Sequence, residues 1–125
     1  MSKLKVLAWA LAALLVCVSC QPSIDSVPIN SLRGMRLDDA LHHISREQTV
    51  LGIVDASVVH GKPPSYKGSE DENSNWFVVA SCADSETTGD ARSMQLAVVT
   101  AADWAGTAAD DEVDWAEYSD VIDCT

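Results

Sequence analysis

The chain has 125 residues with 19 acidic and 8 basic side chains, which gives a formal net charge of −11. This length suits one compact domain with a modest core and is too short for two. Because the excess of acids repels both nucleic acid and anionic lipid headgroups, a nucleic-acid partner is not expected.

The amino-terminal residues predict export. Lys3 and Lys5 form a positive start, and residues 6–18 are apolar without a break. That run has the length of a signal-peptide core and is too short to span a bilayer. We therefore expect residues 1–19 to be a signal peptide. The remaining chain keeps six basic and nineteen acidic side chains, a formal charge of −13.

The apolar core ends in the sequence CVSC, which resembles the lipobox of bacterial lipoproteins. Ser19 suits cleavage before Cys20, although Cys17 stands where a lipobox usually has leucine. We expect Cys20 to carry a lipid that anchors the protein on the outer face of the cell membrane, with residues 20–26 as a short tether. The alternative is ordinary secretion, with the same cleavage and no lipid, and a retained membrane helix ranks behind both.

A helix is predicted at the start of the folded part. Leu37, Ala40, Leu41 and Ile44 fall on one face of a helix of about three turns that ends near residue 48. Two aspartates in its first turn suit the positive end of the helix dipole.

Three strands are predicted after this helix. Residues 50–59 are rich in β-branched side chains, with a glycine and an aspartate that suggest a bulge or bend. Residues 60–75 are dense in turn formers and charge and predict a long exposed loop. The strongest strands are 76–83 and 94–101, which are expected to pair like a hairpin across the polar loop between them.

The carboxyl-terminal residues 102–125 form an acidic extension with no basic residue. Asp111 and the acids after it recur at intervals of three, but an EF-hand needs alternate ligands and a central glycine, which are missing here. A solvated acidic segment is one alternative. The interpretation we favour is a short amphipathic helix in which Val113, Ala116, Glu117 and Val121 line one face, with Trp115 and Tyr118 near its edge. The eight acids of the extension are Asp103, Asp110, Asp111, Glu112, Asp114, Glu117, Asp120 and Asp123.

Short sequence words resemble PASTA domains. VP at 27–28, GM at 34–35 and LDDA at 37–40 are similar to the entry of these domains, and NWFVV at 75–79 and LAVV at 96–99 are similar to two strands of actinobacterial members. The chain departs from the family in its SCADSE turn, which lacks the usual glutamine, proline and glycine, and in an arginine where a helix cap is usual.

This resemblance implies a fold and a class of ligand. The expected fold is α+β, with one helix packed on a small, mostly antiparallel sheet of about three strands over residues 27–101, followed by the acidic extension. The resemblance also implies a non-catalytic module that recognises peptidoglycan fragments or β-lactams outside the cytoplasm.

Few residues point to chemistry of their own. If Cys17 is removed and Cys20 lipidated, Cys82 and Cys124 remain as a pair in an oxidising compartment and are expected to form a disulfide. The alternative is two unrelated thiols. His42 and His43 point about 100° apart on a helix and cannot easily share a metal. We assign no role to His60.

The sequence therefore favours a binding protein of the bacterial cell envelope. Its expected partners are the membrane, through the lipid on Cys20, and a peptidoglycan precursor or an envelope protein near the bilayer. No enzymatic activity, cofactor or metal is expected. The alternative is a modulator that acts by protein contact alone, for example one encoded by a phage or prophage.

Overall fold

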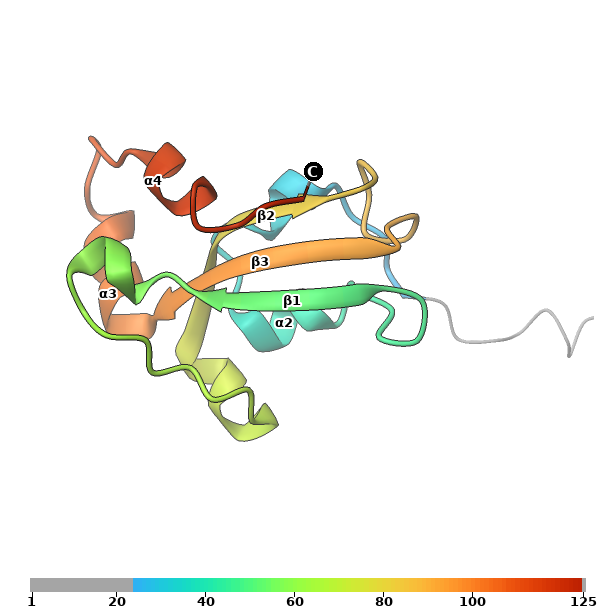
Figure 1. Ribbon diagram of the computed structural model, residues 1–125, viewed down its shortest axis with the longest axis horizontal. Coiled ribbons are helices and arrows are strands. Elements are labelled where there is room, and N and C mark those ends of the chain that lie inside the picture. Colours follow the sequence, from blue (N-terminus) through green and yellow to red (C-terminus); the bar gives the residue numbers. More distant parts are fainter. Residues whose placement is uncertain (1–23, 125) are drawn as a thin grey trace, which may run out of the picture.

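The computed structural model describes residues 24–124, so Cys20 and the predicted signal peptide lie outside the described part. The sheet consists of β1 (Val50–Asp55), β2 (Trp76–Ala83) and β3 (Ser93–Thr100). The strands lie in the order β1-β3-β2, with β3 antiparallel to β2 and parallel to β1 (Figure 1). The α+β class, the three strands and the hairpin pairing are confirmed. The sheet is mixed, whereas a mostly antiparallel one was expected, because the central strand β3 runs parallel to β1 and antiparallel to β2.

The strand expected over 50–59 is shorter, because Asp55 ends it. The register with β3 is unbroken along β1, and the bend follows at Asp55, whose carboxylate accepts hydrogen bonds from the N–H groups of Ser57 and Tyr66 at 2.9 and 2.8 Å. These bonds turn the chain away from the sheet. The crossover to β2 contains two 3-10 helices, η2 (Ser57–His60) and η3 (Glu70–Asn75).

Both faces of the sheet are covered (Figure 1). Met94, Leu96 and Val98 of β3 point toward one face, where they pack with the 3-10 helix η1 (Ile29–Leu32) and the helix α2 (Leu37–Leu41). Ala97 and Val99 point toward the other face, where the carboxyl-terminal extension lies. The central strand is therefore buried on both sides, which explains its nearly continuous apolar sequence.

A bulge in β2 changes which side chains share a face. The pairing with β3 shifts between Val78 and Ala80. Trp76 and Val78, before the shift, belong to the core on the α2 side, whereas Val79 and Ala80 both belong to the core on the extension side. An extra residue in one strand reverses the alternation of the residues that follow. Cys82 is thereby placed on the same face as Cys124.

The predicted three-turn helix is wrong in length. The helix α2 has five residues, its N-cap Arg36 makes no side-chain cap hydrogen bond, and turns follow it. Thr49 then ties the chain to the start of β3, because its hydroxyl donates to the carbonyl of Ala91 at 2.7 Å. Between α2 and Thr49 the backbone makes turn bonds three residues back, such as Ile44 N–H to the Leu41 carbonyl at 3.2 Å, and Ile44 is still buried in the core as its spacing predicted.

The extension is ordered and adds two helices. The helix α3 (Ala101–Ala108) begins directly after β3, where the Thr100 hydroxyl accepts the N–H of Asp103 at 3.2 Å. The helix α4 (Trp115–Ser119) lies within the expected amphipathic segment. Its buried side chain is Tyr118, whereas Ala116 and Glu117, expected on the packed face, are exposed.

The chain enters the domain at the end of the sheet opposite α3. The Ser26 hydroxyl accepts the N–H of Gly89 at 2.9 Å, and the carbonyl of Asp25 lies 2.7 Å from Nδ1 of His43. Seven residue steps of β3 separate this end from α3, a distance of about 23 Å at roughly 3.3 Å per residue. Figure 1 shows α3 and α4 together at that far end of the sheet.

Candidate ligand-binding site

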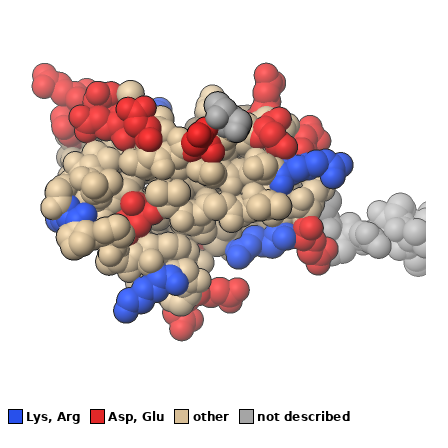
Figure 2. Space-filling view, in the orientation of Figure 1, with Lys and Arg blue, Asp and Glu red and all other residues tan. Residues whose placement is uncertain are grey.

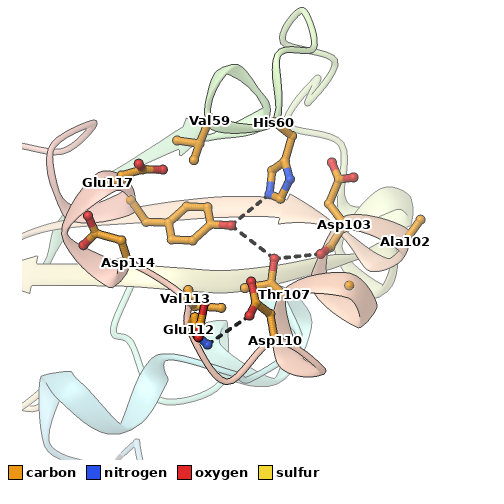
Figure 3. Close-up of a pocket in the computed structure, with 12 residues that line it drawn as sticks. Val59, His60, Ala102, Asp103, Thr107, Asp110, Glu112, Val113, Asp114 and Glu117 are labelled. Carbon is orange, nitrogen blue, oxygen red and sulfur yellow. Dashed lines mark hydrogen bonds between the residues drawn. The ribbon is translucent and has the colours of Figure 1, made fainter.

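A hollow of the described residues lies at this far end. It has a volume of about 490 Å³ and is lined by η2, α3, the loop after α3, and α4 (Figure 3). Two segments distant in the sequence build it, because η2 follows β1 whereas α3 and α4 both belong to the extension. The volume falls within the roughly 300–1,000 Å³ of small-ligand sites.

A chain of hydrogen bonds crosses the hollow. The Thr107 hydroxyl donates to the backbone carbonyl of Asp103 at 2.8 Å, and the Tyr118 hydroxyl lies 3.1 Å from the Thr107 oxygen and 2.9 Å from Nε2 of His60. Since Thr107 has a single hydroxyl proton, it accepts from Tyr118, and Tyr118 accepts from His60. This order places a proton on Nε2 of His60.

Asp103 is the buried acid beside this chain. Its side chain is 8% exposed, and Oδ1 accepts a hydrogen bond from Nζ of Lys62 at 2.7 Å. The second oxygen, Oδ2, is buried and has no hydrogen-bond partner within residues 24–124. A buried carboxylate oxygen without a donor is costly, so the arrangement is under-satisfied at this atom.

The rim of the hollow is acidic. Asp110, Glu112, Asp114 and Glu117 line it, and all four are exposed. Figure 2 shows Asp and Glu side chains gathered over the corner of the molecule that α4 occupies in Figure 1. Two of the acids also shape the rim, since Oδ1 of Asp110 accepts the N–H of Glu112, and Asp114 caps α4.

Aromatic rings join the hollow to the sheet. The ring of Trp104 stacks on Phe77 of β2 at 5.7 Å, and Trp115 lies 6.2 Å from Trp104 and 5.9 Å from Tyr118 between ring centroids. The guanidinium of Arg33 covers the Trp115 ring at 4.4 Å. Such contacts fix ring positions. The hollow is therefore supported by the core on the extension side.

A second hydrogen-bonded cluster holds the crossover loop. Burial raises the pKa of Asp55, but hydrogen bonds from the Ser57 side chain and from the backbone N–H groups of Ser65, Tyr66 and Ser57 outweigh it and leave the pKa below its ordinary value. The pKa of Glu72 is also lowered, chiefly by the Ser69 hydroxyl. These carboxylates serve as caps and turn acceptors and lie outside the lining of the hollow.

The predicted disulfide is present. Cys82 in β2 and Cys124 in the extension are bonded, with Cα atoms 5.8 Å apart. His42 is exposed and His43 contacts the carbonyl of Asp25, and among residues 24–124 no group of three or more His, Cys, Asp or Glu side chains is placed to hold a metal ion. Cys20, the predicted lipid site, lies outside the described residues.

Sequence reasoning missed the residues that build the hollow. Asp103 was one of eight acids without a distinct role, and His60 had none. One signal was present, because Thr100 followed three residues later by Asp103 resembles a helix start after the strand. Nothing local in the sequence links His60 to Tyr118, which lie 58 residues apart.

Comparisons with known proteins add no relative. No family model, curated protein or solved structure matches the chain. The resemblance to PASTA domains therefore stays a prediction. Within the described residues, none of the helices is long and apolar enough to cross a bilayer.

Proposed function

We propose that this protein is exported, anchored to the cell membrane by a lipid on Cys20, and binds a ligand of the cell envelope without transforming it. The binding site is the acid-rimmed hollow between η2, α3 and α4. The observation that carries this proposal is the position of the hollow, which lies at the end of the sheet opposite the point where the chain enters the domain.

The short tether fixes which end of the domain lies near the membrane. Asp25 and Ser26 already contact the domain, so only residues 20–24 remain between the lipid and the fold. Five residues reach at most about 17 Å when fully extended. The entry end is then held next to the bilayer, and the hollow faces away from it, toward soluble or wall-borne ligands.

The side chains of the hollow support binding over catalysis. The only hydroxyls among its lining residues are those of Thr107 and Tyr118, and both are engaged in the hydrogen-bond chain that ends at His60. No cysteine lines it. A nucleophile passes its proton to a neighbouring base, whereas in the hydrogen-bond order above His60 donates to Tyr118 and its Nε2 is not free to accept the hydroxyl proton.

Two experiments test the proposal. Full-length protein expressed in a bacterium with labelled fatty acid should carry the label in its membrane-bound form. The variant Cys20→Ala should lose both label and membrane attachment, while the matched control Cys17→Ala should keep them. Acylation that persists in Cys20→Ala would refute the anchor.

For the ligand, muropeptides and lipid-linked peptidoglycan precursor are titrated against the purified protein while amide NMR signals are recorded. We expect saturable shifts at Thr107, Tyr118 and neighbouring residues of the hollow. The absence of shifts at millimolar ligand, together with specific crosslinking to an envelope protein, would favour a function by protein contact alone.

A further inference from the structure

The class of ligand follows from the one incomplete feature of the hollow, the carboxylate of Asp103. This side chain is more than nine-tenths buried and lines the hollow, and its Oδ2 has no hydrogen-bond partner within residues 24–124. Burying a charge is tolerated where opposite charge and hydrogen bonds surround it. Asp103 has one such partner, Lys62, and room in its hydrogen bonding for another donor.

The two halves of this ion pair are held very differently. Asp103 is fixed in the first turn of α3, where its N–H donates to Thr100 and its carbonyl accepts from Thr107. The Lys62 side chain is 58% exposed and follows Gly61, at the start of an exposed loop. The anion is therefore built into the fold, and the ammonium is the replaceable half.

The surroundings of Asp103 fit a cation carried on an alkyl chain. Val59, Val113 and Tyr118 line the hollow, and the two valines are partly buried. The acids of the rim stand at its opening. Apolar walls that lead to carboxylates suit a side chain with a methylene stem and a charged end.

We propose that the hollow binds a primary alkylammonium group, such as the side chain of a lysine-type residue in an envelope peptide or protein, which displaces Lys62 from Asp103. This inference rests on the proposed function of the hollow as a ligand site. An ammonium carries three donors, so it can satisfy Oδ1 and Oδ2 together and keep one donor for the rim. An organic cation also agrees with the lack of a three-ligand metal group in residues 24–124.

The test uses n-butylammonium chloride as the probe and n-butanol as its neutral counterpart, at constant ionic strength. Full-length protein in detergent is titrated, and the amide signals of Thr107 and Tyr118 are followed by NMR. We expect saturable shifts with n-butylammonium and none with n-butanol. Equal responses to the two probes would overturn the inference, because the acids would then contribute nothing.

Three variants sharpen the test. Lys62→Met keeps the stem but removes the competing ammonium, so n-butylammonium should bind about three- to tenfold more tightly, as expected when the competent state was only partly populated. Asp103→Asn should weaken binding about tenfold or more through loss of a charge-assisted hydrogen bond. The matched control Glu70→Gln, on η3 outside the hollow, should leave the affinity for n-butylammonium unchanged.

The outcomes distinguish the alkylammonium inference from the proposed wall ligand. If Asp103→Asn perturbs the fold, Lys62→Met alone decides, and unchanged or weaker binding in that variant overturns the displacement of Lys62. Binding of n-butylammonium at the hollow without any muropeptide or precursor binding would keep this inference and refute the proposed wall ligand. If muropeptides bind and neither Asp103→Asn nor Lys62→Met changes that binding, the proposed wall ligand is kept and the inference of an alkylammonium site at Asp103 is refuted.

Discussion

Removing the disulfide should cost much of the stability of the domain. In the double variant Cys82→Ala/Cys124→Ala, the unfolded chain regains the freedom of a loop closed across a sequence separation of 42 residues. The chain-entropy relation gives about 4 kcal/mol for a loop of this length. A domain of this size is stable by only about 5–15 kcal/mol, so the variant should remain folded at 25 °C with about 1–11 kcal/mol left.

The loss should be concentrated in the extension. The core on that side contains Val79, Ala80, Ala97 and Val99, which are small, and the aromatic side chains of the extension cover them. Without the disulfide, α4 is held by these contacts and a few hydrogen bonds alone. The extension should therefore open before the sheet unfolds.

Urea denaturation followed by tryptophan fluorescence measures the free energy of unfolding, and limited proteolysis locates the opening. A glutamate-specific protease is the suitable reagent, because the extension has Glu112 and Glu117 but no lysine or arginine for trypsin. Reduced wild-type protein serves as the control and should match the double variant. A loss below about 1 kcal/mol, or no faster cleavage at the two glutamates, would refute this account of the disulfide.

Three further predictions use the same denaturation assay. Tyr118→Phe removes the hydroxyl that lies between His60 and Thr107, so the free energy of unfolding should fall by about 1–2 kcal/mol. Gly34→Ala should cost about 1–2 kcal/mol, because Gly34 has φ +93°, which L-residues rarely adopt, and the added Cβ would lie 3.5 Å from the Trp104 ring. The pKa of Asp55 is lower in the folded state than its ordinary value of about 3.9, so the folded state binds fewer protons in acid. Its stabilisation is present above that ordinary value and is lost as the pH falls through the lowered folded pKa, and Asp55→Asn should flatten this part of the stability curve.

Each of the three has an outcome that contradicts it. Unchanged stability of Tyr118→Phe would mean that the hydrogen-bond chain across the hollow contributes nothing net. A Gly34→Ala variant as stable as wild type would show that the turn relaxes without strain. A stability curve of Asp55→Asn that falls in acid as steeply as that of wild type would assign the acid sensitivity to other carboxylates.

Local patterns in the sequence were enough to locate the three strands, but not α3 or the length of α2. The alternating and β-branched runs located the strands, because side-chain burial in a sheet depends on neighbouring residues in the chain. The positions Leu37, Ala40 and Ile44 marked a core face although the helix itself stops at Leu41. Helix length depends on what the chain must reach next, and here that is Thr49, directly before β1, whose hydroxyl bonds to the carbonyl of Ala91 ahead of β3.

The order of the strands was beyond local reasoning. A hairpin between β2 and β3 follows from their proximity in sequence, but the parallel pairing of β1 with β3 joins segments more than 40 residues apart. The extension posed the same difficulty. The sequence favours a short amphipathic helix there and leaves a solvated acidic segment as the alternative, and the packing of Trp104, Trp115 and Tyr118 against the sheet decides between them.

The disulfide and the hollow show most clearly where the sequence stops and the tertiary structure decides. The cysteine count alone paired Cys82 with Cys124, but strict alternation along β2 would place Cys82 on the same face as Trp76, away from the extension. The bulge after Val78 reverses that alternation and brings the two sulfur atoms together. Likewise, nothing in the local sequence marks His60 and Tyr118 as neighbours, and they meet because the sheet holds η2 beside α4. A binding site depends on distances between side chains that are far apart in the sequence, and no local pattern encodes these distances.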